Sequence, residues 1–234
     1  MARTMQIRLM IFAALMSAVL ARSQTAETAD VRMRLQLPEQ TGRHFPSAVL
    51  WLKPLQPDPL PPPEPERRYT LLQKNRMFTP HLLVIPVGST VNFPNADPFF
   101  HNVFSLFDGK RFNLGLYEPG STKAVTFSRE GVSYIFCNIH PEMSAVVLAL
   151  STSLYNIADS DGAFHLSAVP AADYELHIWV EGVAQPELSR LTRRIHLAPG
   201  SGDLGVLAVS ALQRDATHPN MYGQPYDRSV KPTY

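Results

Sequence analysis

The chain has 234 residues, and its 21 Lys and Arg nearly balance its 20 Asp and Glu, which leaves a formal net charge of +1 at pH 7. A surface that neutralises many phosphates needs a basic excess, so this balance argues against nucleic acid as a partner. The length allows one large domain or two small ones.

The N-terminal residues are typical of a secretory signal. Arg3 and Arg8 accompany an apolar run over residues 9–20, and residues 21–23 place small side chains where a signal peptidase requires them. The run is shorter than the roughly 20 residues of a membrane-spanning helix. We therefore expect residues 1–23 to be removed and the mature protein to be periplasmic or secreted, with no integral membrane span. An uncleaved N-terminal anchor is the alternative.

Two strands are expected next, over residues 31–37 and 48–55. The first stretch alternates apolar and polar residues, and the second is rich in residues that favour strands. Prolines then dominate residues 54–65, and such a segment with few large apolar side chains forms an extended linker. We assign residues 56–68 to this linker, which separates two folding units.

Residues 69–150 combine short apolar runs with turn residues, and no helical periodicity of useful length appears. The expected strands are residues 82–85, 88–93, 124–127, 133–137 and 145–150. A segment of about 80 residues with this pattern is typical of a β-sandwich domain.

Residues 151–211 are also expected to form strands joined by tight turns. Turn sequences lie at residues 159–162 and 169–172, and residues 174–180 alternate between apolar and polar. Residues 212–234 are polar, rich in proline and glycine, and lack a periodic apolar face, so we expect a disordered tail. The sequence thus predicts an all-β protein.

Cys137 is the only cysteine, so no disulfide can form within the chain. A single exported thiol could be a buried apolar residue, a partner in an intermolecular disulfide, a nucleophile or a metal ligand. Its neighbours favour a metal ligand. His140 and Met143 follow it at intervals of three residues, and His101 lies upstream.

Thiolate, imidazole and thioether are donors that suit copper. Two histidines and a cysteine in a near-trigonal plane, with a weak axial methionine, accommodate both Cu(I) and Cu(II) with little rearrangement, so an electron can enter and leave quickly. We therefore predict one copper ion bound by His101, Cys137, His140 and Met143. Each of these residues alone is more often structural, and their joint occurrence carries the prediction.

This region resembles the cupredoxins, most closely plastocyanin and amicyanin. The likeness rests on His101-Asn102, on the Cys-x-x-His-x-x-Met loop with proline after the histidine, and on residues 88–93, and it covers roughly residues 69–150. The resemblance implies a cupredoxin Greek-key β-sandwich with one type 1 (blue) copper ion. It also implies that Asn102 braces the ligand loops through hydrogen bonds.

The same resemblance implies a route for electrons. His140 would be the ligand nearest the surface, framed by apolar neighbours such as Pro141 and either Phe99 or Phe100. Electrons would pass between copper and a protein partner through this histidine.

The flanking segments resemble carboxypeptidase regulatory-like (transthyretin-like) domains. The likeness rests on residues 159–164, Val169-Pro170 and residues 174–176, although Ala171-Ala172-Asp173 replaces the usual glycine after the proline turn. It implies that residues 24–55 and 151–211 form one small β-sandwich into which the copper domain is inserted. The alternative is that the N-terminal strands pair with the cupredoxin sheet.

Four protein ligands leave no open position for a substrate, so we expect an electron carrier between redox proteins rather than an enzyme. The remaining histidines are scattered and form no paired motif of the kind that a multicopper oxidase needs: His44, His81, His165, His177, His196 and His218. A copper store or chaperone is one alternative, weakly supported by His218 and Met221. A carbohydrate-binding or adhesion module, acting through the flanking sandwich, is another.

Overall fold

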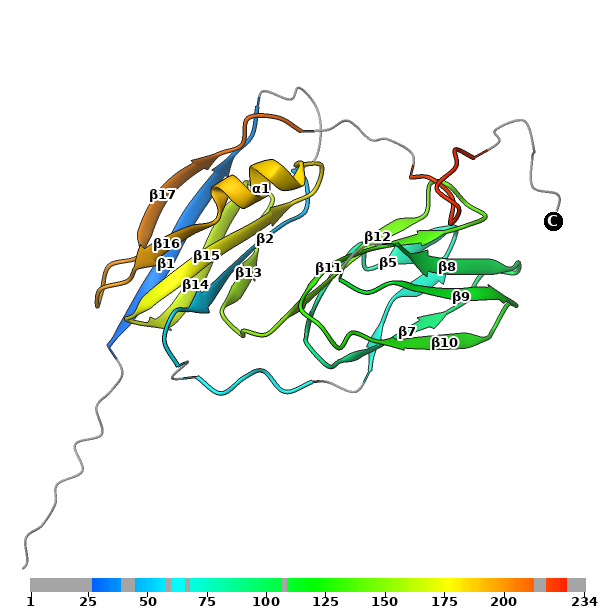
Figure 1. Cartoon of the computed structure of the whole chain (residues 1–234), viewed down its shortest axis with the longest axis horizontal. Coiled ribbons are helices and arrows are strands. Elements are labelled where there is room, and N and C mark those ends of the chain that lie inside the picture. Colours follow the sequence, from blue (N-terminus) through cyan, green and yellow to red (C-terminus); the bar gives the residue numbers. More distant parts are fainter. Residues whose placement is uncertain are drawn as a thin grey trace, which may run out of the picture.

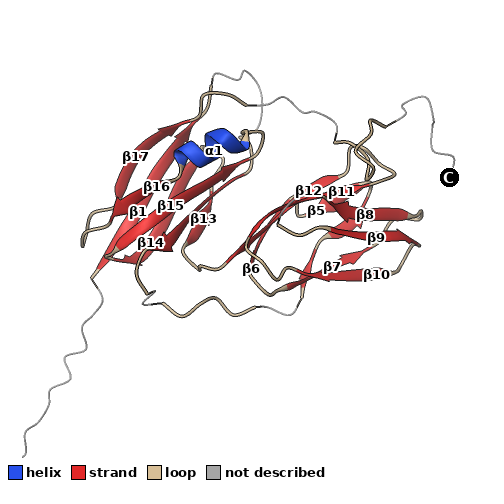
Figure 2. Ribbon diagram, viewed as in Figure 1, coloured by secondary structure: helices blue, strands red, loops and turns tan. Residues whose placement is uncertain are grey.

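The computed structural model describes residues 27–38, 45–57, 60–65, 68–106, 109–212 and 218–226. The expected signal, residues 1–23, lies outside this range. The regular structure of the described residues is β-strand apart from one short helix, so the prediction of an all-β fold is confirmed. The strands gather in two β-sandwiches that lie side by side (Figure 2).

The flanking sandwich is built from two parts of the chain, residues 28–54 and 155–208 (Figure 1). Its sheets have the strand orders β14-β1-β17 and β13-β2-β15-β16. Its elements are β1 (Thr28–Gln36), β2 (Ala48–Pro54), β13 (Tyr155–Ile157), β14 (Ala163–Pro170), β15 (Asp173–Val180), α1 (Gln185–Leu191), β16 (Arg193–His196) and β17 (Asp203–Ala208). Helix α1, which was not expected from the sequence, is only two turns long and has a proline, Pro186, in its first turn.

The central sandwich lies between β2 and β13 in the chain. Its sheets have the orders β10-β7-β3 and β6-β12-β11-β8-β9, and β4 and β5 form a separate hairpin. Its strands are β3 (Tyr69–Thr70), β4 (Leu72–Lys74), β5 (Met77–Thr79), β6 (Leu82–Pro86), β7 (Thr90–Pro94), β8 (His101–Ser105), β9 (Phe112–Tyr117), β10 (Thr122–Thr126), β11 (Gly131–Cys137) and β12 (Ser144–Leu150).

The pairing of β1 and β2 decides how the two sandwiches are connected. β1 pairs with β14 and β17, and β2 pairs with β13 and β15. All these partners follow residue 154, so the N-terminal strands do not join the central sheets. The described part of the chain therefore has the central sandwich between two parts of the flanking one.

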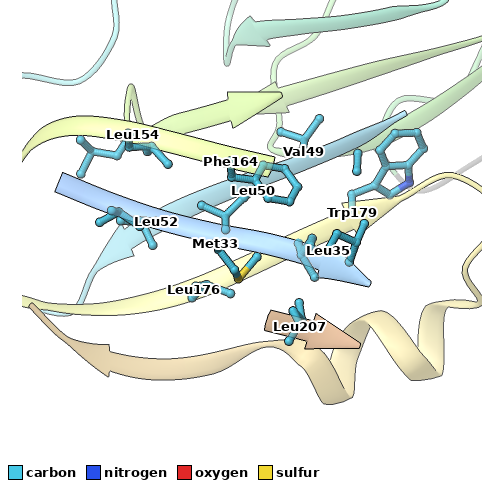
Figure 3. Packing of buried hydrophobic residues seen from close by; sticks show 14 of the residues in the cluster. Met33, Leu35, Val49, Leu50, Leu52, Leu154, Phe164, Leu176, Trp179 and Leu207 are labelled. Carbon is cyan, nitrogen blue, oxygen red and sulfur yellow. The ribbon is translucent and has the colours of Figure 1, made fainter. Parts of the chain in front are cut away.

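Strand β1 shows why these residues form a sheet with one buried face. Successive side chains of a strand point to opposite faces, and Val31, Met33 and Leu35 are at most 3% exposed while their neighbours face solvent. Met33 and Leu35 pack with residues of the opposing sheet, including Leu50 and Trp179 (Figure 3). The alternation predicted for residues 31–37 is thus the core-facing pattern of this strand.

Strand β12 is buried on both faces, which explains its continuous apolar sequence. Residues 145, 147 and 149 belong to the core of the central sandwich, whereas residues 146, 148 and 150 pack in the core of the flanking sandwich. One strand therefore joins the two cores.

Polar contacts accompany this apolar interface. The Nε2 atom of His81, which follows β5, lies 2.6 Å from a carboxylate oxygen of Glu181, which follows β15. Trp179 donates a hydrogen bond of 3.1 Å from its indole nitrogen to the hydroxyl of Tyr134. The flanking sandwich thereby contacts the strand that leads to Cys137.

Candidate metal centre

Two neighbouring strands bring the predicted ligands together. His101 is the first residue of β8 and Cys137 is the last residue of β11, and these strands pair antiparallel with Cys137 opposite Val103. His140 and Met143 lie on the short loop from β11 to β12. The loop is closed by hydrogen bonds from the N–H of Met143 to the carbonyl of His140, at 3.0 Å, and from the N–H of Cys137 to the carbonyl of Met143, at 3.3 Å.

The side chains of His101, Cys137 and His140 form a compact set of donors. The Sγ atom of Cys137 lies 3.5 Å from Nδ1 of His101 and 3.5 Å from Nδ1 of His140. The three ligand atoms all lie within 4.8 Å of one another. A sulfur and a nitrogen bound at about 2.3 and 2.0 Å to one ion in a trigonal plane would lie roughly 3.7 Å apart. The observed spacing therefore fits a single metal ion.

Met143 is fully buried in the same core cluster as Cys137. A thioether is a soft donor, and together with a thiolate and two imidazoles it makes a set that suits copper. Its role as the axial ligand stays a prediction.

The buried surroundings hold both imidazoles in the form that binds metals. Burial lowers the pKa of His140 to about 4, and the charge of a protonated His101 would act in the same direction. Burial also lowers the pKa of His101, although Asp97 opposes this change. Both rings are therefore neutral at pH 7, and each can offer a lone pair to a metal ion.

The thiol of Cys137 has an environment suited to a metal-bound thiolate. Burial raises its pKa, which disfavours an isolated charged sulfur. Backbone N–H groups of Asn102, Ile139 and His140 act in the opposite direction because they hydrogen-bond to the sulfur. A bound cation would supply the compensating charge that the protein alone lacks.

Asn102 contacts the ligand loop mainly through its backbone. Its carbonyl accepts a hydrogen bond of 2.8 Å from the N–H of Asn138, and its side-chain amide donates to Asn113 at 2.6 Å. Asn102 thus links the ligand loop to β8 and, through its side chain, to β9.

His140 is the least buried of the four predicted ligands only by a small margin, because its side chain is 1% exposed and the other three are 0% exposed. The ring of Phe99 packs against both imidazoles, with centroid distances of 5.4 Å to His101 and to His140. The guanidinium of Arg76 lies 5.4 Å from the centre of the same ring. Phe99 therefore separates the ligand rings from solvent, while Phe100 is 49% exposed.

Asp97 is a residue of the site that the sequence analysis did not assign. It is 4% exposed, and its Oδ2 atom lies 2.9 Å from Nε2 of His101. The backbone N–H groups of Asn75 and Arg76 donate to its two oxygens at 2.6 and 3.1 Å. The only feature of the sequence that could have indicated this role is that Asp97 lies four residues before a predicted ligand. The orientation of its carboxylate depends on a hairpin 21 to 22 residues away.

Residues 218–226, which we name the C-terminal strap, belong to the tail of residues 212–234 that was expected to be disordered. They pack beside the ligand loop, whereas residues 213–217 and 227–234 of that tail lie outside the described residues. His218 stacks on Phe136 with ring centroids 4.0 Å apart. The hydroxyl of Tyr226 donates to the carbonyl of Cys137 at 2.8 Å, and the N–H of Met221 donates to the side chain of Asn138 at 2.9 Å. The strap is ordered because it covers an aromatic ring beside the ligand loop, a contact that no local pattern could indicate.

The same contacts give His218 and Met221 structural roles. His218 is stacked on Phe136, and its Nδ1 atom lies 2.9 Å from the carbonyl of Pro219. The sulfur of Met221 accepts a hydrogen bond from Asn113 at 3.8 Å. These packing roles weaken the support that the two residues lent to transient copper capture.

Among the described residues, no helix has the length and apolar character needed to cross a membrane. No protein-family model matches the chain, and no curated protein sequence matches it.

Several solved structures are similar to part of the chain. A purple cupredoxin from Nitrosopumilus maritimus is 28% identical, with 36% of this chain and 100% of that chain covered and a TM-score of 0.32. A Cu-containing nitrite reductase from Thermus scotoductus SA-01 is 25% identical; the match covers 43% of this chain and 26% of that chain, with a TM-score of 0.35. A reduced amicyanin mutant is 21% identical; the match covers 36% of this chain and 82% of that chain, with a TM-score of 0.33. Because these TM-scores lie below 0.5, we draw no functional conclusion from the likenesses.

Proposed function

We propose that the protein is an exported type 1 copper protein that carries single electrons between redox proteins. One copper ion would be held by His101, Cys137, His140 and Met143. The observation that carries this proposal is the buried group of one thiol and two imidazole nitrogens within 4.8 Å of one another. Copper bound there would supply a one-electron couple.

The burial of the site favours electron transfer over catalysis on a substrate. His101 and Cys137 are 0% exposed and His140 is 1% exposed, so the ligands have no free path to a bulky reactant. An electron can pass through the protein atoms that cover the ligands, whereas a catalytic metal needs an open coordination position. We therefore propose no enzymatic activity.

The surrounding protein would keep the ligands in one arrangement. His101 and Cys137 lie on paired strands, and the loop hydrogen bonds restrict His140. Ligands that move little between the two oxidation states allow rapid electron exchange. The flanking sandwich, which we propose to be a carboxypeptidase regulatory-like domain, would support this arrangement through β12. We further propose a periplasmic or secreted location.

The direct test is addition of Cu(II) to the purified apo protein. We expect one copper per chain, an intense visible thiolate-to-copper band and a reversible one-electron couple in voltammetry. Cys137→Ser should lose the band and keep the fold, whereas the matched control His196→Gln, at an exposed position, should retain both.

The same experiment separates the alternatives. A colourless protein that binds only Cu(I) would support copper storage, and a blue Cys137→Ser variant would exclude the thiolate as the source of colour. Absence of copper binding by the wild-type chain would refute the proposed function.

A further inference from the structure

We propose that Asp97 positions His101 for metal binding by holding its imidazole as the tautomer protonated on Nε2. This inference rests on the copper site proposed above. It concerns a residue outside the four predicted ligands and connects the ligand set to the hairpin of β4 and β5.

The two ring nitrogens of His101 have different partners and therefore different roles. Nε2 lies 2.9 Å from a carboxylate oxygen, and an ionised carboxylate can only accept a hydrogen bond, so the proton belongs on Nε2. Nδ1 lies 3.5 Å from the sulfur of Cys137 and is left with its lone pair toward the donor set. The partner of one nitrogen thus determines which nitrogen is available to the metal.

Asp97 is itself held firmly. Burial alone would raise its pKa, but the hydrogen bonds from Arg76, His101 and Asn75 outweigh burial, and the pKa is lowered. Its own N–H donates to the side chain of Asn95 at 3.0 Å. The position of the carboxylate is therefore set by groups on both sides.

The hairpin turn has a conformation that suits this anion. Asn75 and Arg76 both have positive φ, 56° and 57°, which is uncommon for residues other than glycine. Consecutive N–H groups in a turn can converge on one anion, and here both donate to Asp97. The N–H of Ala96 also bonds to the carbonyl of Gln73 on β4 at 2.9 Å. The hairpin turn thus forms the binding site for the carboxylate of Asp97.

The hydrogen-bond inventory explains why an amide could not replace Asp97. Three N–H donors, from Asn75, Arg76 and His101, converge on two oxygens. Asparagine has one oxygen and one NH2 group, so at least one donor would face another donor. Where the NH2 group takes the Oδ2 position, it faces both Nε2 of His101 and the N–H of Arg76. His101 can relieve its own part of this conflict by moving its proton to Nδ1 and accepting from the NH2 group. The nitrogen needed by copper would then carry a proton.

The first measurement uses the wild-type apo protein and needs no metal. Long-range ¹H–¹⁵N correlation spectra near neutral pH should show His101 protonated on Nε2. In Asp97→Asn the population protonated on Nδ1 should increase. Wild-type His101 protonated mainly on Nδ1 would overturn the inference even if the variant did not fold.

The second measurement compares copper affinity and reduction potential. Asp97→Asn should bind Cu(II) about 10- to 100-fold more weakly in a chelator competition, as found when the partner of a ligating histidine is removed. Its potential should rise because a negative charge that stabilises Cu(II) is lost. Glu142→Gln is the matched control, since Glu142 acts on Cys137 and His140 through its charge.

Equal affinities and potentials for Asp97→Asn and Glu142→Gln would reduce Asp97 to a nearby charge and overturn its positioning role. Failure of the wild-type chain to bind copper would refute the proposed function instead, and the tautomer in the apo protein would still test the contact between Asp97 and His101. The two failures are therefore distinguishable.

Discussion

Leu148 tests the contact between the two sandwiches most directly. It is 0% exposed and points from β12 into the core of the flanking sandwich. Leu148→Ala removes three carbon groups, a loss of about 2.4 kcal/mol at about 0.8 kcal/mol for each buried group. The cavity left behind adds to this loss, so we expect a decrease of about 2–5 kcal/mol in the free energy of unfolding.

The chain provides a separate optical probe for each sandwich. Both of its tryptophans, Trp51 and Trp179, lie in the flanking sandwich, whereas the proposed copper–thiolate band would report on Cys137 in the central one. Urea unfolding of the wild-type copper protein should give coincident transitions because β12 joins the two cores. In Leu148→Ala the tryptophan transition should move to lower urea and separate from loss of the visible band.

Val147→Ala is the control on the opposite face of the same strand. Val147 is 0% exposed and packs in the central core, so its truncation should act first on the visible band. An ordinary surface substitution changes the free energy of unfolding by less than about 0.5 kcal/mol. A decrease that small for Leu148→Ala would refute the burial of the Leu148 face of β12 against the flanking sandwich.

Three further predictions concern the ligand loop and the domain contact. Met143→Leu should raise the copper potential and Met143→Gln should lower it, because a stronger oxygen donor stabilises Cu(II); equal potentials by voltammetry would remove Met143 from the copper sphere. Tyr226→Phe removes the hydrogen bond to the Cys137 carbonyl and should cost about 0.5–1.5 kcal/mol with faster copper loss to a chelator; unchanged melting and release would show that the strap does not hold the loop. Glu181→Gln should lower the melting temperature more at about pH 6, where His81 is charged, than at about pH 9, where it is neutral. An equal decrease in melting temperature at both pH values would contradict a charged pair.

The sign of the last effect follows from the two pKa shifts. The hydrogen bond to Glu181 is the main cause that raises the pKa of His81 above its usual 6.5, so its stabilisation is complete below 6.5 and is lost as pH rises through the raised value. The hydrogen bond to His81 lowers the pKa of Glu181 below its usual 4.5, so that contribution is lost as pH falls below this range. The pair is therefore most stabilising between about pH 4.5 and 6.5.

Local patterns were sufficient for many of the strands and for most of the candidate ligands, although β8, which carries His101, and β9 were not among the expected strands. Alternation identified the buried face of β1, and the continuous apolar run over residues 145–150 identified β12. Cys137, His140 and Met143 share one short loop, so their spacing alone suggested a common site. His101 was added by its donor type and by resemblance, and the pairing of β8 with β11 brings it within 3.5 Å of the thiol.

Other features required the tertiary structure because they depend on residues far apart in the chain. The carboxylate of Asp97 is oriented by the turn at Asn75 and Arg76, and the Tyr226 hydroxyl reaches the carbonyl of a residue 89 positions away. Neither contact leaves a periodic signal in the sequence.

The amino-acid sequence by itself determined the all-β character of the chain and the donor types available to a metal, because strand periodicity and ligand chemistry are local properties. The tertiary structure alone decided the burial of His140 behind Phe99, the two-sided burial of β12 and the packing of the strap. These features depend on which surfaces meet, and hydrophobic burial and hydrogen-bond geometry select those surfaces only once the whole chain has folded.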